Sequence, residues 1–161
     1  MKTRHFLLFV VVLMSLWLVG CAPEQSRMEY LATGGRAEVR GEMNGVAFSA
    51  VIEIAQNGEY ILVEYLSPDA LCGLKLIAQG EECQVTLGDV SFVCDVDEVA
   101  GFLRPATVLL PYGYANSVQK EGENTLLTFP DGGRITLSQK GEPVSFLRDD
   151  MRFDVVWWEK R

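Results

Sequence analysis

Residues 36–54 read RAEVRGEMNGVAFSAVIEI, and this stretch decides the fold. Asn44-Gly45 is a strong signal for a two-residue hairpin turn. A hairpin centred on this turn puts apolar residues on one face and polar residues on the other, as expected for a half-buried antiparallel pair. The apolar face pairs Met43 with Val46, Gly41 with Phe48, Val39 with Ala50 and Ala37 with Ile52. The polar face pairs Glu42 with Ala47, Arg40 with Ser49 and Arg36 with Glu53.

Two further turn signals extend this pattern. Asn57-Gly58 pairs Ile52 with Val63 and Ala50 with Tyr65, so a third strand continues the same apolar face. Agreement between independent local signals strengthens the prediction. A strand follows at 74–78. Gly88-Asp89 then closes another tight hairpin, in which Leu87 meets Val90, Val85 meets Phe92 and Cys83 meets Cys94.

Residues 95–118 interrupt the strands. Asp95 or Asp97 is expected to cap a short helix through Glu98–Leu103, which Pro105 stops. Residues 107–114 are expected to pack on the sheet, as a further helical turn or as an irregular lid. Strands return at 125–129, 134–138, 143–147 and 151–158. A meander of about nine strands with one apolar face must curl around that face or close on itself.

The N-terminus reads as an export signal. Lys2 and Arg4 give it a positive start, and an apolar run follows from Phe6 to Val19. That run is shorter than the ~20 residues that a membrane-spanning helix needs, but it suits the core of a signal peptide. An uncleaved anchor helix, or a plain signal peptide followed by an incidental cysteine, is the alternative.

Leu18-Val19-Gly20-Cys21 resembles the lipobox of bacterial lipoproteins, which is cut just before the cysteine. The resemblance implies a lipidated Cys21 as the mature N-terminus, with acyl chains such as palmitate that hold the chain to a membrane. We therefore expect a signal peptide at 1–20, a lipidated cysteine and tether at 21–35, and one β domain at 36–161. A short helix is expected in the tether around Glu24–Ala32.

Charge and histidine content exclude several function classes. The full chain has a net charge of −8. Removing residues 1–20 takes away two bases and no acid, which leaves 12 basic and 22 acidic residues and a net charge of −10. Nucleic acid binding needs clustered cations, so no nucleic acid partner is expected. The single histidine, His5, lies in the signal, so the mature chain has no histidine nucleophile pair, general base or imidazole metal ligand.

The remaining cysteines are Cys72, Cys83 and Cys94. An exported protein permits disulfides, and the expected register sets Cys83 across from Cys94 at bridging distance. The turn geometry makes this a hydrogen-bonded pair, which is a less favourable site for a bridge. Three reduced cysteines packed as small hydrophobic side chains are the alternative.

Metal and cofactor chemistry has weak support. No CxxC spacing exists, and Asp95-Val96-Asp97-Glu98 is the only acidic cluster worth testing for calcium. It lacks the glycine and the spaced acids of an EF-hand loop, so a solvated helix cap is favoured. We expect no catalytic residues, no metal and no cofactor.

The apolar face carries many aromatic residues. They are either core or the lining of a cavity for an acyl chain, with residues 95–118 as its lid. The candidate cavity residues are Phe48, Ile52, Val63, Tyr65, Phe92, Phe146, Phe153 and Trp157.

The order of these segments resembles the LolA-like superfamily, which includes the outer-membrane lipoprotein carriers LolA and LolB. The resemblance rests on the lipobox, Phe48–Ile52, Tyr60–Tyr65, the stretch Ser67–Leu74, Gly141–Phe146 and a terminal strand at Arg152–Val155. It implies a mainly β fold: an incomplete antiparallel half-barrel, one or two short covering helices, and a lipid-sized apolar cavity.

Two non-catalytic functions follow as expectations. The first is an exported lipoprotein, anchored on the outer face of a bacterial cell membrane or in an outer membrane, that binds a lipid or lipoprotein acyl chain. The second is a scaffold that tethers or activates an envelope or cell-wall enzyme through an apolar patch such as Tyr60, Leu62 and Leu66. An enzyme is the third and weakest alternative, because histidine is missing.

Overall fold

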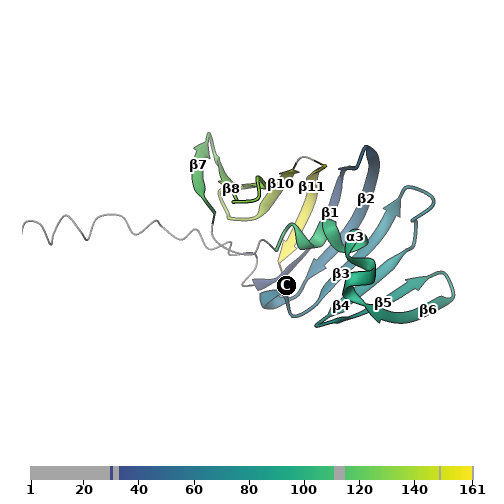
Figure 1. The fold of residues 1–161 in the computed structure, drawn as a ribbon. Coiled ribbons are helices and arrows are strands. Elements are labelled where there is room, and N and C mark those ends of the chain that lie inside the picture. The colour runs from purple at the N-terminus through teal and green to yellow at the C-terminus, as the bar shows by residue number, and fades with distance from the viewer. Residues whose placement is uncertain (1–29, 31–32, 111–114, 149, 161) are drawn as a thin grey trace, which may run out of the picture.

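The computed structural model describes residues 30, 33–110, 115–148 and 150–160. These residues form an antiparallel sheet of 11 strands and one α-helix, α3 (Val96–Thr107). Figure 1 shows α3 lying against the sheet. The strands are β1 (Gly35–Met43), β2 (Val46–Ile54), β3 (Ile61–Ser67), β4 (Lys75–Gln79), β5 (Glu82–Leu87), β6 (Val90–Asp95), β7 (Ser117–Glu121), β8 (Asn124–Thr128), β9 (Arg134–Leu137), β10 (Pro143–Arg148) and β11 (Met151–Lys160).

The sheet consists of two meanders joined in the middle. Its order is β6-β5-β4-β3-β2-β1-β11-β10-β9-β8-β7, so the first and last strands in sequence are neighbours. The sheet does not close, because β6 and β7 are its two edges, and the chain between these edges contains α3. The predicted mainly β half-barrel with a short helix is therefore confirmed.

The predicted registers of the first three strands are also confirmed. Gly41 pairs with Phe48 and Ala50 pairs with Tyr65, as the turn signals indicated. Asn44 and Gly45 both have positive φ, 52° and 78°, which is the conformation that the tight hairpin turn requires. The second turn is wider than a two-residue hairpin, because residues 56–58 form a 3₁₀ turn, η1 (Gln56–Gly58). The pairing of β2 with β3 is still the predicted one, because the predicted two-residue turn and the wider turn in the structure have the same midpoint in the sequence.

α3 covers the inner face of the sheet, which is the face that carries the core, and it contacts β2 to β6. Asp95 occupies its N-cap position, but its side chain makes no capping hydrogen bond, and Asp97 and Glu98 lie in the first turn of the helix. The expected stop at Pro105 is wrong, because the helix continues to Thr107. Pro105 lies in the last turn and is buried with its neighbour Ala106, so packing offsets the hydrogen bond that proline removes.

Two tyrosine hydroxyls hold α3 and the segment after it. The Tyr65 hydroxyl donates to the carbonyl oxygen of Phe102 at 2.8 Å, and the Tyr30 hydroxyl donates to that of Leu109 at 2.7 Å. Burial raises the pKa of Tyr65 to about 12, and burial also raises the pKa of Tyr30. Both groups therefore remain protonated donors at physiological pH.

The sequence did not indicate β7. Its residues, Ser117–Glu121, alternate poorly and are exposed along most of their length. Pairing with β8, in which Glu121 opposes Asn124 across Gly122-Glu123, holds the strand in place. A polar edge strand of this kind lacks the hydrophobic period that would reveal it.

A row of aromatic rings crosses the middle of the sheet on its inner face. Phe146 stacks on Phe153, with centroids 5.5 Å apart and planes at 26°. Phe153 meets Phe48 edge to face at 6.3 Å, and Phe48 meets Tyr65 at 6.4 Å. Gly41 of β1 pairs with both Phe48 and Phe153, so the two rings meet over a residue without a side chain.

The predicted pairing of Cys83 with Cys94 is present, but no disulfide joins them. Cys72, Cys83 and Cys94 are all free thiols in the structure. Burial raises the pKa of the Cys83 thiol and also that of the Cys94 thiol, and the nearby Glu98 and Asp95 add to the shift at Cys94. Both sulfurs therefore have less of the thiolate form that disulfide chemistry needs.

The first prediction concerns Gly41. A Cβ at this position would lie 2.0 Å from the carbonyl oxygen of Arg152 and 2.5 Å from Phe153. Gly41→Ala should therefore lower the free energy of unfolding of the full chain by about 1–3 kcal/mol, measured by urea denaturation. Gly101→Ala is the control, because a Cβ there meets nothing within 4 Å and the residue is helical. Equal stability of Gly41→Ala and the native chain would contradict the close approach of β1 and β11.

The second prediction concerns the thiols. In the native chain at about pH 8, iodoacetamide should alkylate the exposed Cys72 first and the buried Cys83 only after unfolding. The raised pKa of the partly exposed Cys94 thiol should keep its alkylation rate in the native chain rising with pH beyond the usual thiol range. Mass spectrometry of unreduced protein measures both effects. Failure of Cys83 and Cys94 to label in denaturant without reductant would reveal a disulfide instead.

Candidate ligand-binding pocket

A pocket of about 290 Å³ lies between the C-terminal end of α3 and the strands β8 to β10. One wall comes from α3 and the residues after it, and the opposite wall comes from the β8–β9 turn and β10. The lining residues are Arg104, Thr107, Val108, Leu110, Phe129, Pro130, Asp131, Gly133, Phe146 and Arg148.

The apolar part of the pocket is built on Phe129 and Phe146, which are both buried in the core. Phe129 follows β8, and Phe146 lies on β10 at the end of the aromatic row. Val108 and Leu110 supply the apolar surface on the helix side, where they pack against the core. The pocket is therefore continuous with the core of the half-barrel.

The β8–β9 turn shapes one side of the mouth. The Phe129 amide donates to the carbonyl oxygen of Gly133 at 2.9 Å, and the Gly133 amide donates to Asp131 Oδ1 at 3.0 Å. A Cβ on Gly133 would lie 3.1 Å from that same Asp131 oxygen, so a larger residue would push against the turn. Pro130-Asp131-Gly132-Gly133, which the sequence identified only as a turn, thus forms part of the pocket wall.

Two ion pairs line or border the pocket. Arg148 Nη1 lies 3.2 Å from Asp131 Oδ2, and Arg104 Nη1 lies 2.7 Å from Asp150 Oδ2. The hydrogen bond from Arg104 holds the pKa of Asp150 below its usual range, and the same bond raises the pKa of Arg104. These four groups are partly exposed, so the pairs add little to stability, but they place two guanidinium groups beside apolar surface.

The Arg104–Asp150 pair also joins the two meanders. Arg104 belongs to the helix that covers β2 to β6, whereas Asp150 lies in the turn between β10 and β11. The Asn44 amide of the β1–β2 turn donates to the Asp150 carbonyl oxygen at 2.7 Å. The pocket therefore opens near this end of the sheet, and Gly35, where the expected tether joins β1, lies at the other end.

The structure separates the eight candidate cavity residues into two groups. Six are buried in the core, and only Phe146 among them lines the pocket. These six are Phe48, Ile52, Val63, Tyr65, Phe146 and Phe153. Phe92 and Trp157 are exposed instead, at 53% and 38%.

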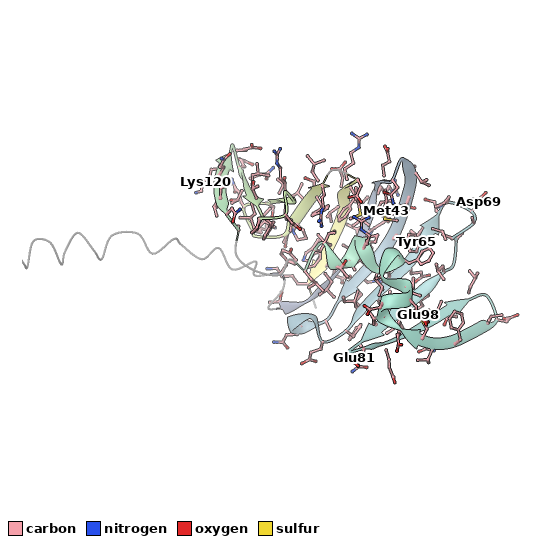
Figure 2. All side chains as sticks on the ribbon, in the orientation of Figure 1. Met43, Tyr65, Asp69, Glu81, Glu98 and Lys120 are labelled. Carbon is pink, nitrogen blue, oxygen red and sulfur yellow. The ribbon has the colours of Figure 1, made fainter. Side chains whose placement is uncertain are left out.

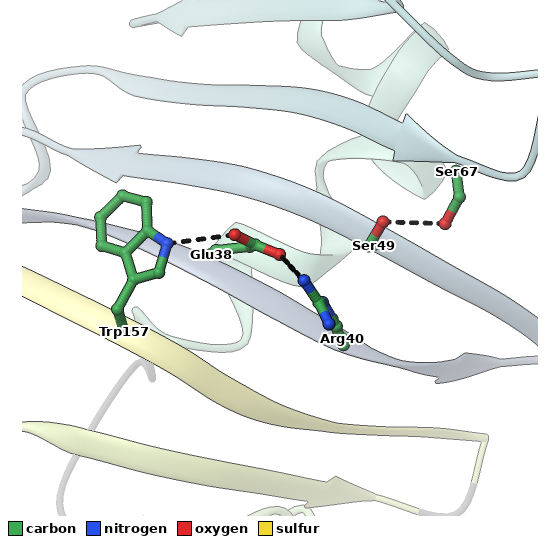
Figure 3. A network of polar contacts seen from close by, with 5 residues as sticks. All are labelled: Glu38, Arg40, Ser49, Ser67 and Trp157. Atoms are coloured by element: carbon green, nitrogen blue, oxygen red, sulfur yellow. Dashed lines mark hydrogen bonds and ion pairs between the residues drawn. The ribbon is translucent and has the colours of Figure 1, made fainter.

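The placement of Trp157 on the apolar face is wrong. A register shift after Glu38 pairs Trp157 with Glu38 and Val155 with Val39, so Val156 is the extra residue of a β-bulge. Trp157 then points to the outer face, where its Nε1 donates to Glu38 Oε2 at 3.1 Å (Figure 3). Trp158 turns inward in its place and meets Tyr30 edge to face at 5.4 Å.

The outer face around Trp157 is polar. Glu38 Oε1 accepts hydrogen bonds from Arg40 Nε and Nη2 at 2.9 and 2.7 Å, and Ser49 Oγ lies 2.8 Å from Ser67 Oγ, as Figure 3 shows. The hydrogen bonds from Arg40 and Trp157 lower the pKa of Glu38. Trp157 therefore belongs to a surface network and not to a cavity.

Phe92 pairs with the buried Val85 and shares its face, as expected. It is nevertheless exposed, because β6 is an edge strand and has β5 as its only strand neighbour in the described sheet. Sequence alternation indicates the face of a residue, but it does not indicate how far a covering element extends over that face.

Sequence reasoning missed most of the pocket. Arg104 gave no signal, because it is a single cation within an apolar segment, and Arg148 gave none, because it lies beside Asp149-Asp150, which the sequence indicated only as a bend. In the parts of the chain that the structure describes, no group of three or more His, Cys, Asp or Glu residues could hold a metal ion. No helix in those parts is long and apolar enough to cross a membrane. Cys21 and the expected tether helix at 24–32 lie outside the described residues, except for Tyr30.

Comparison with known proteins returns only structural likenesses. No protein-family model and no curated protein sequence matches this chain. An uncharacterised conserved protein of Thermus thermophilus is similar in structure, with a TM-score of 0.54 and 14% identity, over 83% of this chain and 82% of that one. At this identity the likeness shows a shared fold.

Two further structures are similar at lower scores. A LolA superfamily protein of Nitrosomonas europaea has a TM-score of 0.44 and 10% identity, over 85% of this chain and 91% of that one. The Mycobacterium tuberculosis lipoprotein LppX has a TM-score of 0.46 and 14% identity, over 85% of this chain and 92% of that one. One of these two neighbours is named for the superfamily that the sequence pattern resembles.

Proposed function

We propose that this chain is a membrane-anchored extracytoplasmic lipoprotein, without catalytic activity, that binds part of a lipid or lipoprotein acyl chain in the pocket under α3. The observation that carries the proposal is a pocket with an apolar floor of Phe129 and Phe146 beside two arginines, Arg104 and Arg148. An apolar wall suits a hydrocarbon chain, and guanidinium groups suit a carboxylate or phosphate at its end.

The size of the pocket limits the ligand. A volume of about 290 Å³ lies at the lower end of the ~300–1,000 Å³ typical of small-molecule sites. Ile52, Val63 and their neighbours fill the rest of the interior with side chains. The proposal is therefore a site for the end of one chain, and a whole diacyl lipid would need a larger space.

The anchor is proposed from the sequence. Leu18-Val19-Gly20-Cys21 supports lipidation of Cys21, and the chain from Cys21 to Gly35 supplies a tether to the first strand. Two or more acyl chains on that cysteine would hold the protein durably at the outer face of the membrane.

The scaffold function is the second candidate. The expected outer-face patch offers one exposed large side chain, Leu66, whereas Tyr60 and Leu62 are half-buried. The Tyr60 hydroxyl is also hydrogen-bonded to Glu53. That patch by itself therefore gives little support to a protein partner.

The third prediction tests the anchor. Cys21→Ser should move the full chain from the detergent phase to the aqueous phase in a Triton X-114 partition, because the chain loses its acyl groups. Cys72→Ser is the matched control, since Cys72 is an exposed thiol of the folded domain, and it should stay in the detergent phase. Loss of partition in both variants, or in neither, would contradict the assignment of Cys21.

The fourth prediction tests the pocket. Val108→Trp should fill the space between α3 and β10 and lower the binding of radiolabelled palmitate by about tenfold or more. Val118→Trp places the same ring on the exposed β7 and should leave binding unchanged. Native protein that binds no palmitate, and that releases no lipid on solvent extraction, would overturn the proposal.

A further inference from the structure

β6 is an open edge of the sheet. It pairs with β5 on one side, and no described strand pairs with it on the other, as Figure 1 shows. An edge strand presents backbone groups that a further strand can bind. The side chains and charges around this edge indicate what it can accept.

The outward backbone groups of β6 belong to Ser91 and Val93. The two-residue turn makes Leu87 and Val90 a hydrogen-bonded pair, and such pairs alternate along an antiparallel ladder. Phe92 therefore bonds back to β5, whereas the amides and carbonyls of its two neighbours turn outward. Within the described chain, the Ser91 and Val93 amides have no backbone or side-chain acceptor.

The side chains of this edge are apolar on both faces. Phe92 on the inner face is 53% exposed, and Val93 on the outer face is 64% exposed. Leu87 and Val90, at the turn, are exposed as well. Residues 90–94 contain no charge and no proline, and the β5–β6 register has no bulge. None of the usual protections of an edge strand is present between Val90 and Cys94.

The other edge of the sheet is protected. β7 ends in Lys120 and Glu121, and its residues are mostly polar. Figure 2 shows Lys120 at this edge. The same pairing rule turns the Val118 and Lys120 backbone groups outward, so a charged side chain lies on a residue that would face an added strand. β6 is therefore better suited than β7 to pair with an added strand.

The charge at the end of β6 indicates which kind of strand this edge can bind. Glu81, Asp95, Asp97 and Glu98 line one depression where β6 passes into α3. Figure 2 shows Glu81 and Glu98 at this end of the β5–β6 hairpin. The influence of Asp95 and Glu98 reaches back along the strand, because both raise the pKa of the Cys94 thiol in addition to the effect of burial. Asp89 lies at the opposite end, in the turn.

A second copy of this chain, paired about Phe92, fits the edge poorly. Antiparallel pairing of two β6 strands that brings Ser91 opposite Val93 also brings Asp95 of one copy opposite Asp89 of the other. Like charges placed directly opposite each other are destabilising. A segment that carries cations would instead find four carboxylates at one end of the edge.

We propose that β6 is a strand-addition site for an extended segment of another protein. The segment runs antiparallel to β6, carries apolar side chains at alternate positions for contact with Phe92 or Val93, and has lysine or arginine at its amino end beside Glu81 and Asp97. Main-chain hydrogen bonds to Ser91 and Val93 supply affinity, and the acidic depression sets direction. The inference is independent of the ligand in the pocket, which lies beneath the other end of α3.

The fifth prediction uses two peptides as probes, acetyl-KKVTVTVT-amide and acetyl-EEVTVTVT-amide, added to the full chain in detergent at low salt. Fluorescence anisotropy should show at least tenfold tighter binding of the lysine peptide, because the acidic depression attracts its amino end. Hydrogen exchange should slow at Ser91 and Val93. Val93→Pro removes an outward donor and should weaken binding at least tenfold, whereas Val118→Pro on the other edge should change binding less than twofold.

A second measurement uses the native chain alone and so does not depend on whether a variant folds. Lysine peptides N-methylated at every valine or at every threonine block opposite edges of the added strand, and only one of the two should still bind. Equal affinity for the lysine and glutamate peptides, or equal loss in both proline variants, would overturn the proposal. So would a dimer of the native chain, or its binding to phosphatidylcholine vesicles, that Val93→Pro abolishes. The palmitate-binding assay tests the pocket independently of the peptide-binding assay at β6.

Discussion

The antiparallel pairing of β1 with β11 is the constraint on which the rest of the structure depends. It joins the first and last strands along nearly their whole lengths and so converts two separate meanders into one sheet. The approach is close because Gly41 has no side chain, and a Cβ there would collide with the backbone at Arg152. Phe48 and Phe153 can then meet over β1 and link the cores of the two meanders.

The helix depends on this joined sheet. α3 lies across β2 to β6. Two contacts hold it: the hydrogen bond from the Tyr65 hydroxyl to a carbonyl oxygen of the helix, and the ion pair of Arg104 with Asp150. Because Arg104 reaches Asp150 in the opposite meander, the end of the helix and the β8–β10 strands face each other and form the pocket walls. The pocket therefore exists only because two meanders and one helix meet at the same end of the sheet.

The open edge follows from the same topology. Because the two meanders join in the middle of the sheet, the outermost strands, β6 and β7, do not pair with each other. α3 begins directly after β6 and runs toward the centre of the sheet. Val85 is buried and Phe92 is exposed, although the two residues pair on the same face. Burial along one face of a curved sheet is set by the reach of the covering element, and not by alternation alone.

The sequence by itself determined the strand class, the hairpin registers and the apolar face. These are local properties: Asn44-Gly45 and Gly88-Asp89 set turn geometry, and a side-chain period of two sets the face. Only the tertiary structure decided the β1–β11 pairing, the bulge that exchanges Trp157 for Trp158, and the meeting of Arg104 with Asp150. These features depend on contacts between residues far apart in the chain, for which a single sequence carries no local signal. The pocket is made of such contacts, and β6 is an edge strand because the order of the whole sheet places no second strand beside it.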